Sequence, residues 1–127
     1  MAQIVTVTQN APAPAGPYSQ AIASGAFPAV SGQVGIDPAT GQAPAGVAAQ
    51  TRQALTNLDA ILTAAGVGKE DVLKTTCFLA DVNDFPIFNE AYSAYFGDHR
   101  PARSTVGVQL FGGYLVEVEA LVVLPGK

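Results

Sequence analysis

An arginine at the start of a short apolar segment is the first residue whose chemistry points to a ligand. Arg103 follows Pro101 and precedes Ser104, Thr105 and Val106, in a chain with few charged residues. A guanidinium group binds a carboxylate through two parallel hydrogen bonds, which lysine does less well. The alternative is an ordinary surface arginine at the end of a strand. Arg103 is therefore a candidate carboxylate-binding residue.

Two glutamates at alternate positions are the second feature that could carry chemistry. Glu117 and Glu119 share one face of a predicted strand with Leu115, Leu121 and Val123, because side chains two residues apart point the same way. A carboxylate on an apolar face needs a partner, a water molecule or solvent. Either both glutamates are ordinary outward-facing charges, or one of them orients a reactive water molecule.

Other residue types that often take part in catalysis give weaker signals. Tyr18, after the rigid Pro17, could form the wall of a pocket or simply pack. His99 lies in a polar segment, which favours a solvated loop histidine, and Cys77 lies in an apolar strand, which favours an inert core residue. Each is the only residue of its type, so one chain can assemble neither a disulfide nor a Cys/His zinc site. Residues 66–69 lack the spacing of a phosphate-binding loop.

The composition limits the class of protein. A chain of 127 residues fits one domain, residues 1–127. Its charged fraction is 13% and its hydrophobic fraction 49%, which suggests that part of its surface is buried in an oligomer. A net charge of −4 argues against nucleic acid or an anionic membrane as a partner. We find no secretion signal and no long apolar run, so the expected location is the cytoplasm.

The periodicity of apolar residues predicts the elements that must position these side chains. Alternation, β-branched residues and turn signals predict strands over residues 3–7, 19–24, 27–36, 72–79, 103–109 and 115–124. A helical spacing of apolar residues predicts a helix over residues 46–65 that ends at Gly66. A second helix is predicted near Pro86, with Asp84 as its N-cap and Gly97 at its end.

This order of elements predicts an α+β fold in which two helices cover one face of a mixed sheet. The strands at residues 72–79 and 115–124 carry apolar side chains on both faces. The face away from the helices must therefore meet another sheet, most simply in a symmetric homo-oligomer.

A series of short motifs, in order along the chain, resembles the reactive-intermediate deaminase family (RidA, also called YjgF). The motifs are Gly16-Pro17-Tyr18-Ser19-Gln20, Ser31-Gly32-Gln33, Lys74-Thr75-Thr76, Asn83, Pro101-Ala102-Arg103-Ser104 and Glu117-Val118-Glu119-Ala120. Each motif is weak alone, and the ordered set is specific. The resemblance implies a chorismate-mutase-like fold and a homotrimer, with the sheets as a central barrel and three clefts between subunits.

The resemblance also implies roles for individual residues. Arg103 would hold the substrate carboxylate, and backbone groups of Gly32 and Thr105 would contact the reacting end. Glu117 would hold the attacking water. Tyr18 and Asn89 would line the cleft from the neighbouring subunit. Many relatives have cysteine where this chain has Thr105, and residues 111–114 are also individual to this chain.

The implied activity is hydrolysis of 2-imino or 2-enamino acids, such as 2-iminobutanoate and 2-iminopropanoate, to 2-oxo acids and ammonia, without metal or cofactor. Pyridoxal-phosphate dehydratases would supply these reactive compounds, and their removal would be a form of metabolite damage control with no stable complex between the enzymes. Two alternatives stay open. One is a non-catalytic trimer that binds small carboxylates, and the other is an RNA-cleaving inhibitor of translation, which the acidic charge disfavours.

Overall fold

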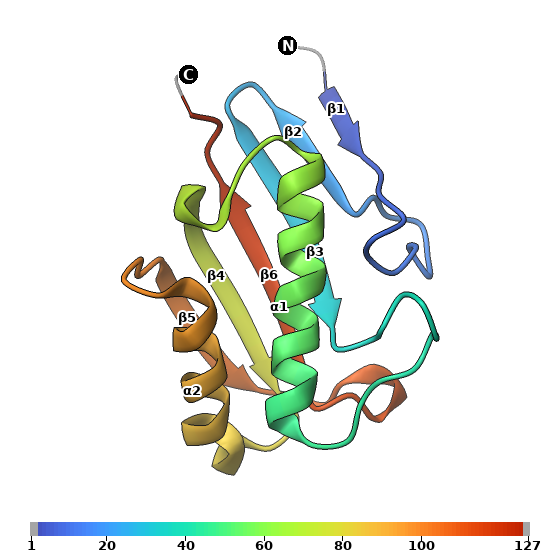
Figure 1. Cartoon of the computed structure of the whole chain (residues 1–127), viewed down its shortest axis with the longest axis vertical. Coiled ribbons are helices and arrows are strands. Elements are labelled where there is room, and N and C mark those ends of the chain that lie inside the picture. The colour runs from blue at the N-terminus through green and yellow to red at the C-terminus, as the bar shows by residue number, and fades with distance from the viewer. Residues whose placement is uncertain (1–2, 126–127) are drawn as a thin grey trace.

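The computed structural model describes residues 3–125, which form one six-stranded sheet and two helices (Figure 1). The strands run in the order β1-β2-β3-β6-β4-β5 across the sheet. Their bounds are β1 Gln3–Thr6, β2 Ala21–Ser24, β3 Phe27–Val34, β4 Val72–Leu79, β5 Ala102–Gly107 and β6 Val116–Val122. The helices are α1 Val47–Ala64 and α2 Phe85–Phe96. All six strands and both helices lie where the sequence predicts them, with small shifts at their ends.

The pairing of the strands separates the two candidate catalytic residues. β4 and β5 are parallel, whereas β4 pairs with β6 in the antiparallel sense. The last two strands of the chain are therefore not neighbours, because β4 lies between them. Arg103 lies on the edge strand β5, and Glu117 lies on β6 in the interior of the sheet.

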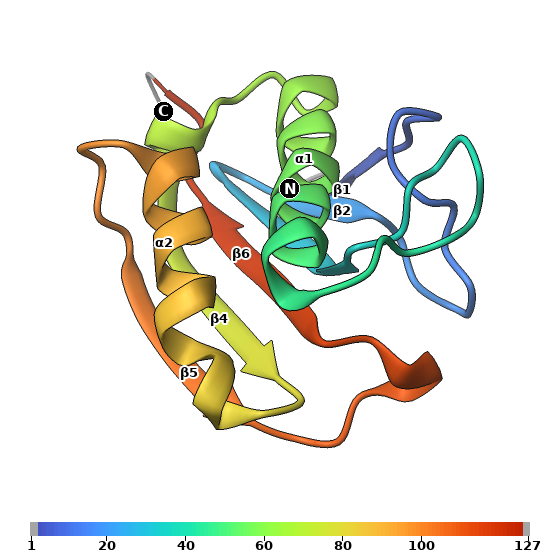
Figure 2. The same ribbon diagram turned by 60° about the horizontal axis from the view of Figure 1, so that its bottom comes forward.

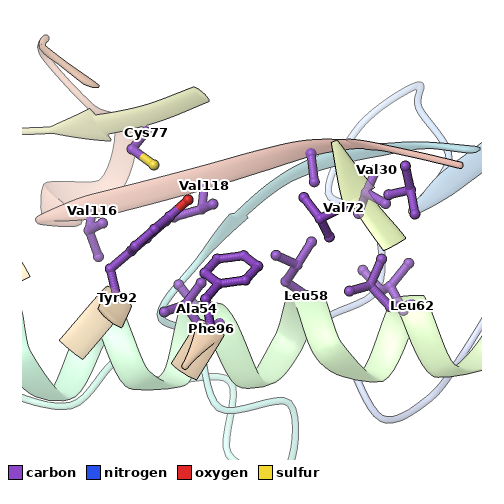
Figure 3. Close-up of a cluster of buried hydrophobic side chains, with 14 of the residues drawn as sticks. Val30, Ala54, Leu58, Leu62, Val72, Cys77, Tyr92, Phe96, Val116 and Val118 are labelled. Carbon is purple, nitrogen blue, oxygen red and sulfur yellow. The ribbon is translucent and has the colours of Figure 1, made fainter. Parts of the chain in front are cut away.

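Both helices lie on one face of the sheet, as the α+β prediction requires (Figure 2). Between the helices and the sheet is the hydrophobic core, part of which is drawn in Figure 3. In α1 the buried side chains Leu58 and Leu62 point toward the sheet, and in α2 Tyr92 and Phe96 do the same. This apolar layer fixes the positions of α2 and β5 relative to each other, and so positions Arg103.

The two helix ends differ in how well the sequence predicts them. Gly66 takes a positive φ of 80° after α1, and the amide of Val67 donates to the carbonyl of Leu62, so the predicted end is confirmed. Asp84 is the N-cap residue of α2, as predicted, but its side chain makes no capping hydrogen bond. A short 3₁₀ turn, Val82–Asp84, leads directly into α2, and this turn is capped by the carboxylate of Asp81, which accepts from the Asn83 amide.

The face of the sheet opposite the helices carries apolar side chains that none of residues 3–125 covers. Leu121 is 42% exposed, Val106 42% and Phe27 53%. These values agree with the expected partner sheet, which a lone chain does not supply. Within residues 3–125, no helix has the length and apolar character needed to cross a membrane.

Candidate active site

Arg103 is held in an aromatic environment with its hydrogen-bond donors unused. Its guanidinium carbon lies 4.7 Å from the ring centroid of Tyr92, 5.5 Å from that of Phe85 and 5.7 Å from that of Phe88. Among residues 3–125 it forms no ion pair and no side-chain hydrogen bond. The side chain is half-buried, and a guanidinium group is positively charged in proteins. The rings hold the guanidinium plane in place and leave its donors free for an anion.

The position of Arg103 follows from the register of β5. Arg103 pairs with Thr75 of β4, which is fully buried, and the Thr75 hydroxyl lies 2.8 Å from the hydroxyl of Tyr92. This hydrogen bond ties α2 to β4 directly beside the arginine. The side chain is half-buried and stacked on aromatic rings, which disfavours the alternative of an ordinary surface arginine at the end of a strand.

A pocket of about 350 Å³ opens beside Arg103, within the size range of small-molecule sites. It is lined by Asn89, Tyr92, Ser93, Arg100, Pro101 and Arg103. Its two arginines make it a site for a small anion. A larger and more open depression of about 620 Å³ lies elsewhere, near Asp81 and Tyr114, and no cationic side chain lines it. We therefore assign the candidate site to the smaller pocket.

Asn89 lies on the same side of the cleft as Arg103, which corrects one expectation. The resemblance places Asn89 in the neighbouring subunit's wall, whereas the structure has it line the pocket of its own chain's Arg103. Its Oδ1 atom is buried without a hydrogen-bond partner. A buried polar atom of this kind is rare and often marks a functional site.

Glu117 lies on the opposite wall of the sheet, against a glycine. A methyl group at residue 32 would overlap Oε2 of Glu117, so Gly32 leaves the space that this carboxylate occupies. Glu117 is half-buried while Glu119 is exposed. Burial, and to a smaller extent the charge of Glu119, raises the pKa of Glu117. Of the two glutamates, Glu117 has the environment that favours a role in proton transfer.

Arg103 and Glu117 of one chain cannot contact the same small ligand. Phe78 of β4 pairs with both Glu117 and Val106, so these residues point to one face of the sheet. Arg103 lies three positions before Val106 and therefore points to the other face, toward α2. The sheet itself separates the guanidinium from the carboxylate, and a site containing both needs a second copy of the chain.

The remaining predicted site residues divide between these two halves. Thr105 lies two positions after Arg103, on the same face, and its Oγ1 is buried without a partner. Tyr18 is 50% exposed, and its hydroxyl accepts a hydrogen bond from the amide of Ala15. The backbone after Tyr18 lies against Ser31, next to Gly32. Thr105 and Asn89 thus accompany Arg103, while Tyr18 and Gly32 accompany Glu117.

The single cysteine and the single histidine do not line the pocket beside Arg103. Cys77 is fully buried, as predicted, and burial raises the pKa of its thiol to about 11. His99 is not the solvated loop residue that its neighbours suggest: it is half-buried, and its Nε2 lies 2.8 Å from the carbonyl of Val72. Residues 3–125 contain no group of three or more His, Cys, Asp or Glu side chains placed to hold a metal ion.

Sequence reasoning missed the aromatic residues around Arg103. Phe85, Phe88 and Tyr92 are spaced by three and four residues, which is the signal for one face of a helix. That signal marks a face, but it does not show which strand lies beneath it. Only the parallel pairing of β5 with β4 reveals that this face covers Arg103.

The chain is similar to named proteins along almost its full length. A family model described as endoribonuclease L-PSP matches residues 8–124. A RutC family protein of Pyrococcus horikoshii is 50% identical over 119 residues, covering 92% of this chain and 94% of that protein. The 2-iminobutanoate/2-iminopropanoate deaminase of Escherichia coli K12 is 47% identical over 120 residues, covering 91% and 94%. Among solved structures, E. coli TdcF with bound serine has a TM-score of 0.91 at 40% identity, covering 94% of this chain and 98% of that one.

Proposed function

Because the chain belongs to the RidA (YjgF) family, whose model is described as endoribonuclease L-PSP, we propose that it hydrolyses 2-imino and 2-enamino acids to 2-oxo acids and ammonia. The observation that carries this proposal is the guanidinium of Arg103, stacked on three rings with its donors unpaired. Relatives at 47% and 49% identity are named 2-iminobutanoate/2-iminopropanoate deaminase. The serine bound to TdcF is also a small acid with a 2-nitrogen.

The proposed site is built by two copies of the chain. One copy contributes Arg103, with Asn89 and the backbone of Thr105, and the other contributes Glu117, Gly32 and Tyr18. This division follows from the sheet that separates Arg103 from Glu117 within one chain. A homotrimer in which the uncovered sheet faces form a barrel would provide three such clefts and bury the exposed Leu121.

The chemistry requires positioning, an anion clamp and one activated water. Arg103 holds the carboxylate, which places the protonated C=N carbon beside Glu117 of the other copy. Glu117 takes a proton from the water molecule as the water oxygen bonds to that carbon. Glu117 then returns that proton to the nitrogen of the amino alcohol, the C–N bond breaks to release ammonia, and the hydroxyl gives up its proton to Glu117, which leaves the 2-oxo acid.

The direct test couples the purified protein to an excess of a pyridoxal-phosphate threonine dehydratase. Since the dehydratase releases 2-iminobutanoate, appearance of 2-oxobutanoate should accelerate in proportion to added protein above the rate of spontaneous hydrolysis. A heat-denatured sample is the control. An unchanged rate with the native protein would contradict the deaminase. If 2-oxobutanoate still raised the melting temperature, the carboxylate binder would be the surviving function.

A pH profile tests the role of Glu117 without removing it. The Glu119 charge helps to raise the pKa of Glu117, so Glu119→Gln should lower that pKa. The active carboxylate form then persists to lower pH, and the acid limb of kcat/KM should move toward lower pH. Burial still raises the pKa of Glu117 in this variant, so the acid limb should remain at a higher pH than that expected for an exposed glutamate. Glu70→Gln is the control, because Glu70 is a remote exposed carboxylate, and this variant should leave the acid limb at the wild-type pH. An acid limb at the wild-type pH in Glu119→Gln would argue against Glu117 as the group that activates water.

RNA cleavage is the second candidate function, because the description of the family model names an endoribonuclease. The net charge of −4 opposes RNA binding, and the ring of the single histidine, His99, is engaged with the carbonyl of Val72. An RNase-free preparation that still cleaves RNA would restore this alternative.

A further inference from the structure

A buried glutamine near the N-terminus holds a long proline-containing loop in one position. Gln20 is 2% exposed, and its side-chain amide bonds only to backbone groups of residues 8–12. Its Oε1 accepts from the amide of Thr8 at 2.8 Å, and its Nε2 donates to the carbonyls of Thr8 and Pro12 at 3.0 Å each. A single side chain thus holds both ends of this segment.

The loop needs such a side chain because of its composition. Residues 8–18, which we call the proline loop, contain Pro12, Pro14 and Pro17, and proline has no amide hydrogen to donate. A regular backbone ladder cannot form across it. Removing Gln20 would leave the buried carbonyl of Ala11 and its neighbours without donors.

The proline loop ends at Tyr18, whose ring is held in place and yet exposed. The Tyr18 amide donates to the carbonyl of Gly16 at 2.8 Å, and its hydroxyl accepts from the amide of Ala15 at 3.1 Å. The side chain is nevertheless 50% exposed. Ordering an exposed aromatic side chain costs conformational entropy and buries little apolar surface in the single chain. The Tyr18 ring is therefore placed so that it can contact a molecule outside the chain.

The same segment is fixed relative to the Glu117 half of the candidate site. The Ser31 hydroxyl donates to the carbonyl of Ser19 at 2.6 Å, and the Ser31 amide donates to the carbonyl of Gln20 at 2.9 Å. Ser31 directly precedes Gly32, which lies against Glu117. The loop is therefore held at one end by the Gln20 side chain and at the other by the strand that accommodates the carboxylate.

We propose that Gln20 is a positioning residue, which fixes the proline loop so that Tyr18 meets the substrate beside Glu117. This inference rests on the proposed function. Among the described residues, the Gln20 side chain makes no hydrogen bond to Tyr18 and does not line the pocket, so its effect on the reaction passes through the loop. Loosening the loop should weaken substrate binding more than it slows the chemical step, because the groups that hold the carboxylate and the water stay in place.

The test compares two ways of loosening the loop. Gln20→Met removes every bond of the amide at similar length, and Pro14→Gly adds backbone freedom at an exposed site without touching the core. We expect each to raise KM about five- to tenfold while kcat changes less than twofold. For Gln20→Met this is the effect expected from loss of about one to two hydrogen bonds, and for Pro14→Gly it follows from the added freedom of the loop backbone. Thr51→Val is the matched control, because it removes a buried 2.7 Å hydrogen bond to backbone within α1, outside the proline loop; KM should not change.

A double-mutant cycle separates positioning from a general loss of stability. If Gln20 acts through Tyr18, the KM effects of Gln20→Met and of Pro14→Gly should both disappear when Tyr18 is already alanine. Additive effects in that cycle, or an unchanged KM in both loop variants, would overturn the inference. If the wild type shows no turnover, the proposed function fails separately. Hydrogen exchange of the Thr8 amide then tests the clamp itself: faster exchange in Gln20→Met but not in Thr51→Val supports it, and equal exchange overturns it.

Discussion

Replacing Arg103 with alanine is expected to lower kcat/KM for imine hydrolysis by about a hundredfold or more, the cost of losing a charged, two-point contact to a carboxylate. The same change should abolish the rise in melting temperature caused by 2-oxobutanoate. The physical reason is that the guanidinium has no partner in the described chain other than aromatic rings, so its donors are available to the ligand. The coupled dehydratase assay measures the first effect and thermal denaturation the second.

Two further variants show whether the geometry of the group matters. Arg103→Lys keeps the charge but loses the planar fork, so it should recover only part of the activity. Arg100→Ala removes the other arginine of the pocket, which is exposed and already bonded to the carbonyl of His99. It should cost much less than Arg103→Ala. Equal losses in Arg100→Ala and Arg103→Ala would mean that the pocket acts through its net charge alone.

Glu117→Gln is expected to reduce kcat by about a hundred- to ten-thousandfold, the range for loss of a proton-transferring group. The amide keeps the shape of the side chain, so Gly32 still accommodates it, but it cannot take a proton from water. Binding of 2-oxobutanoate should change little, because Arg103 holds the carboxylate. A variant with near-normal turnover would exclude Glu117 as the group that activates water.

The same substitution should make the protein more stable at neutral pH. The pKa of Glu117 is raised in the folded state, so ionisation above its ordinary pKa favours the unfolded chain, and this penalty disappears as the pH falls. Glutamine carries no such penalty. The melting temperature of Glu117→Gln should therefore exceed that of the wild type at pH 7, and the gap should close as the pH approaches 4. A gap that stays constant with pH would show that ionisation is not its cause.

The sequence predicts elements well where local signals act alone. The strand at residues 72–79 has the bounds of β4, and the end of α1 at Gly66 follows from a local backbone preference. The N-cap of α2 is Asp84, as predicted, but the sequence does not show the 3₁₀ turn before it, in which the side chain of Asp81 rather than that of Asp84 makes the capping hydrogen bond. Similarly, His99 lies in a loop, as its neighbours suggest, but a contact with the distant Val72 leaves it half-buried rather than solvated.

The candidate site is harder to predict because it depends on pairing between distant segments. The residue types of Arg103 and Glu117 suggest their chemistry, yet the sequence does not show that β4 lies between their strands. It also does not show that α2 brings Asn89 beside Arg103 of the same chain. Gln20 is the clearest omission: no local pattern distinguishes it from a surface glutamine, and its partners lie at least eight residues away.

The separation of Arg103 and Glu117 by their own sheet has a genetic consequence. In the proposed trimer, a chain defective at Arg103 still carries an intact Glu117 wall, and a chain defective at Glu117 still carries an intact arginine. Two alleles that are each inactive alone would therefore complement one another, since every mixed assembly contains one cleft with both intact walls.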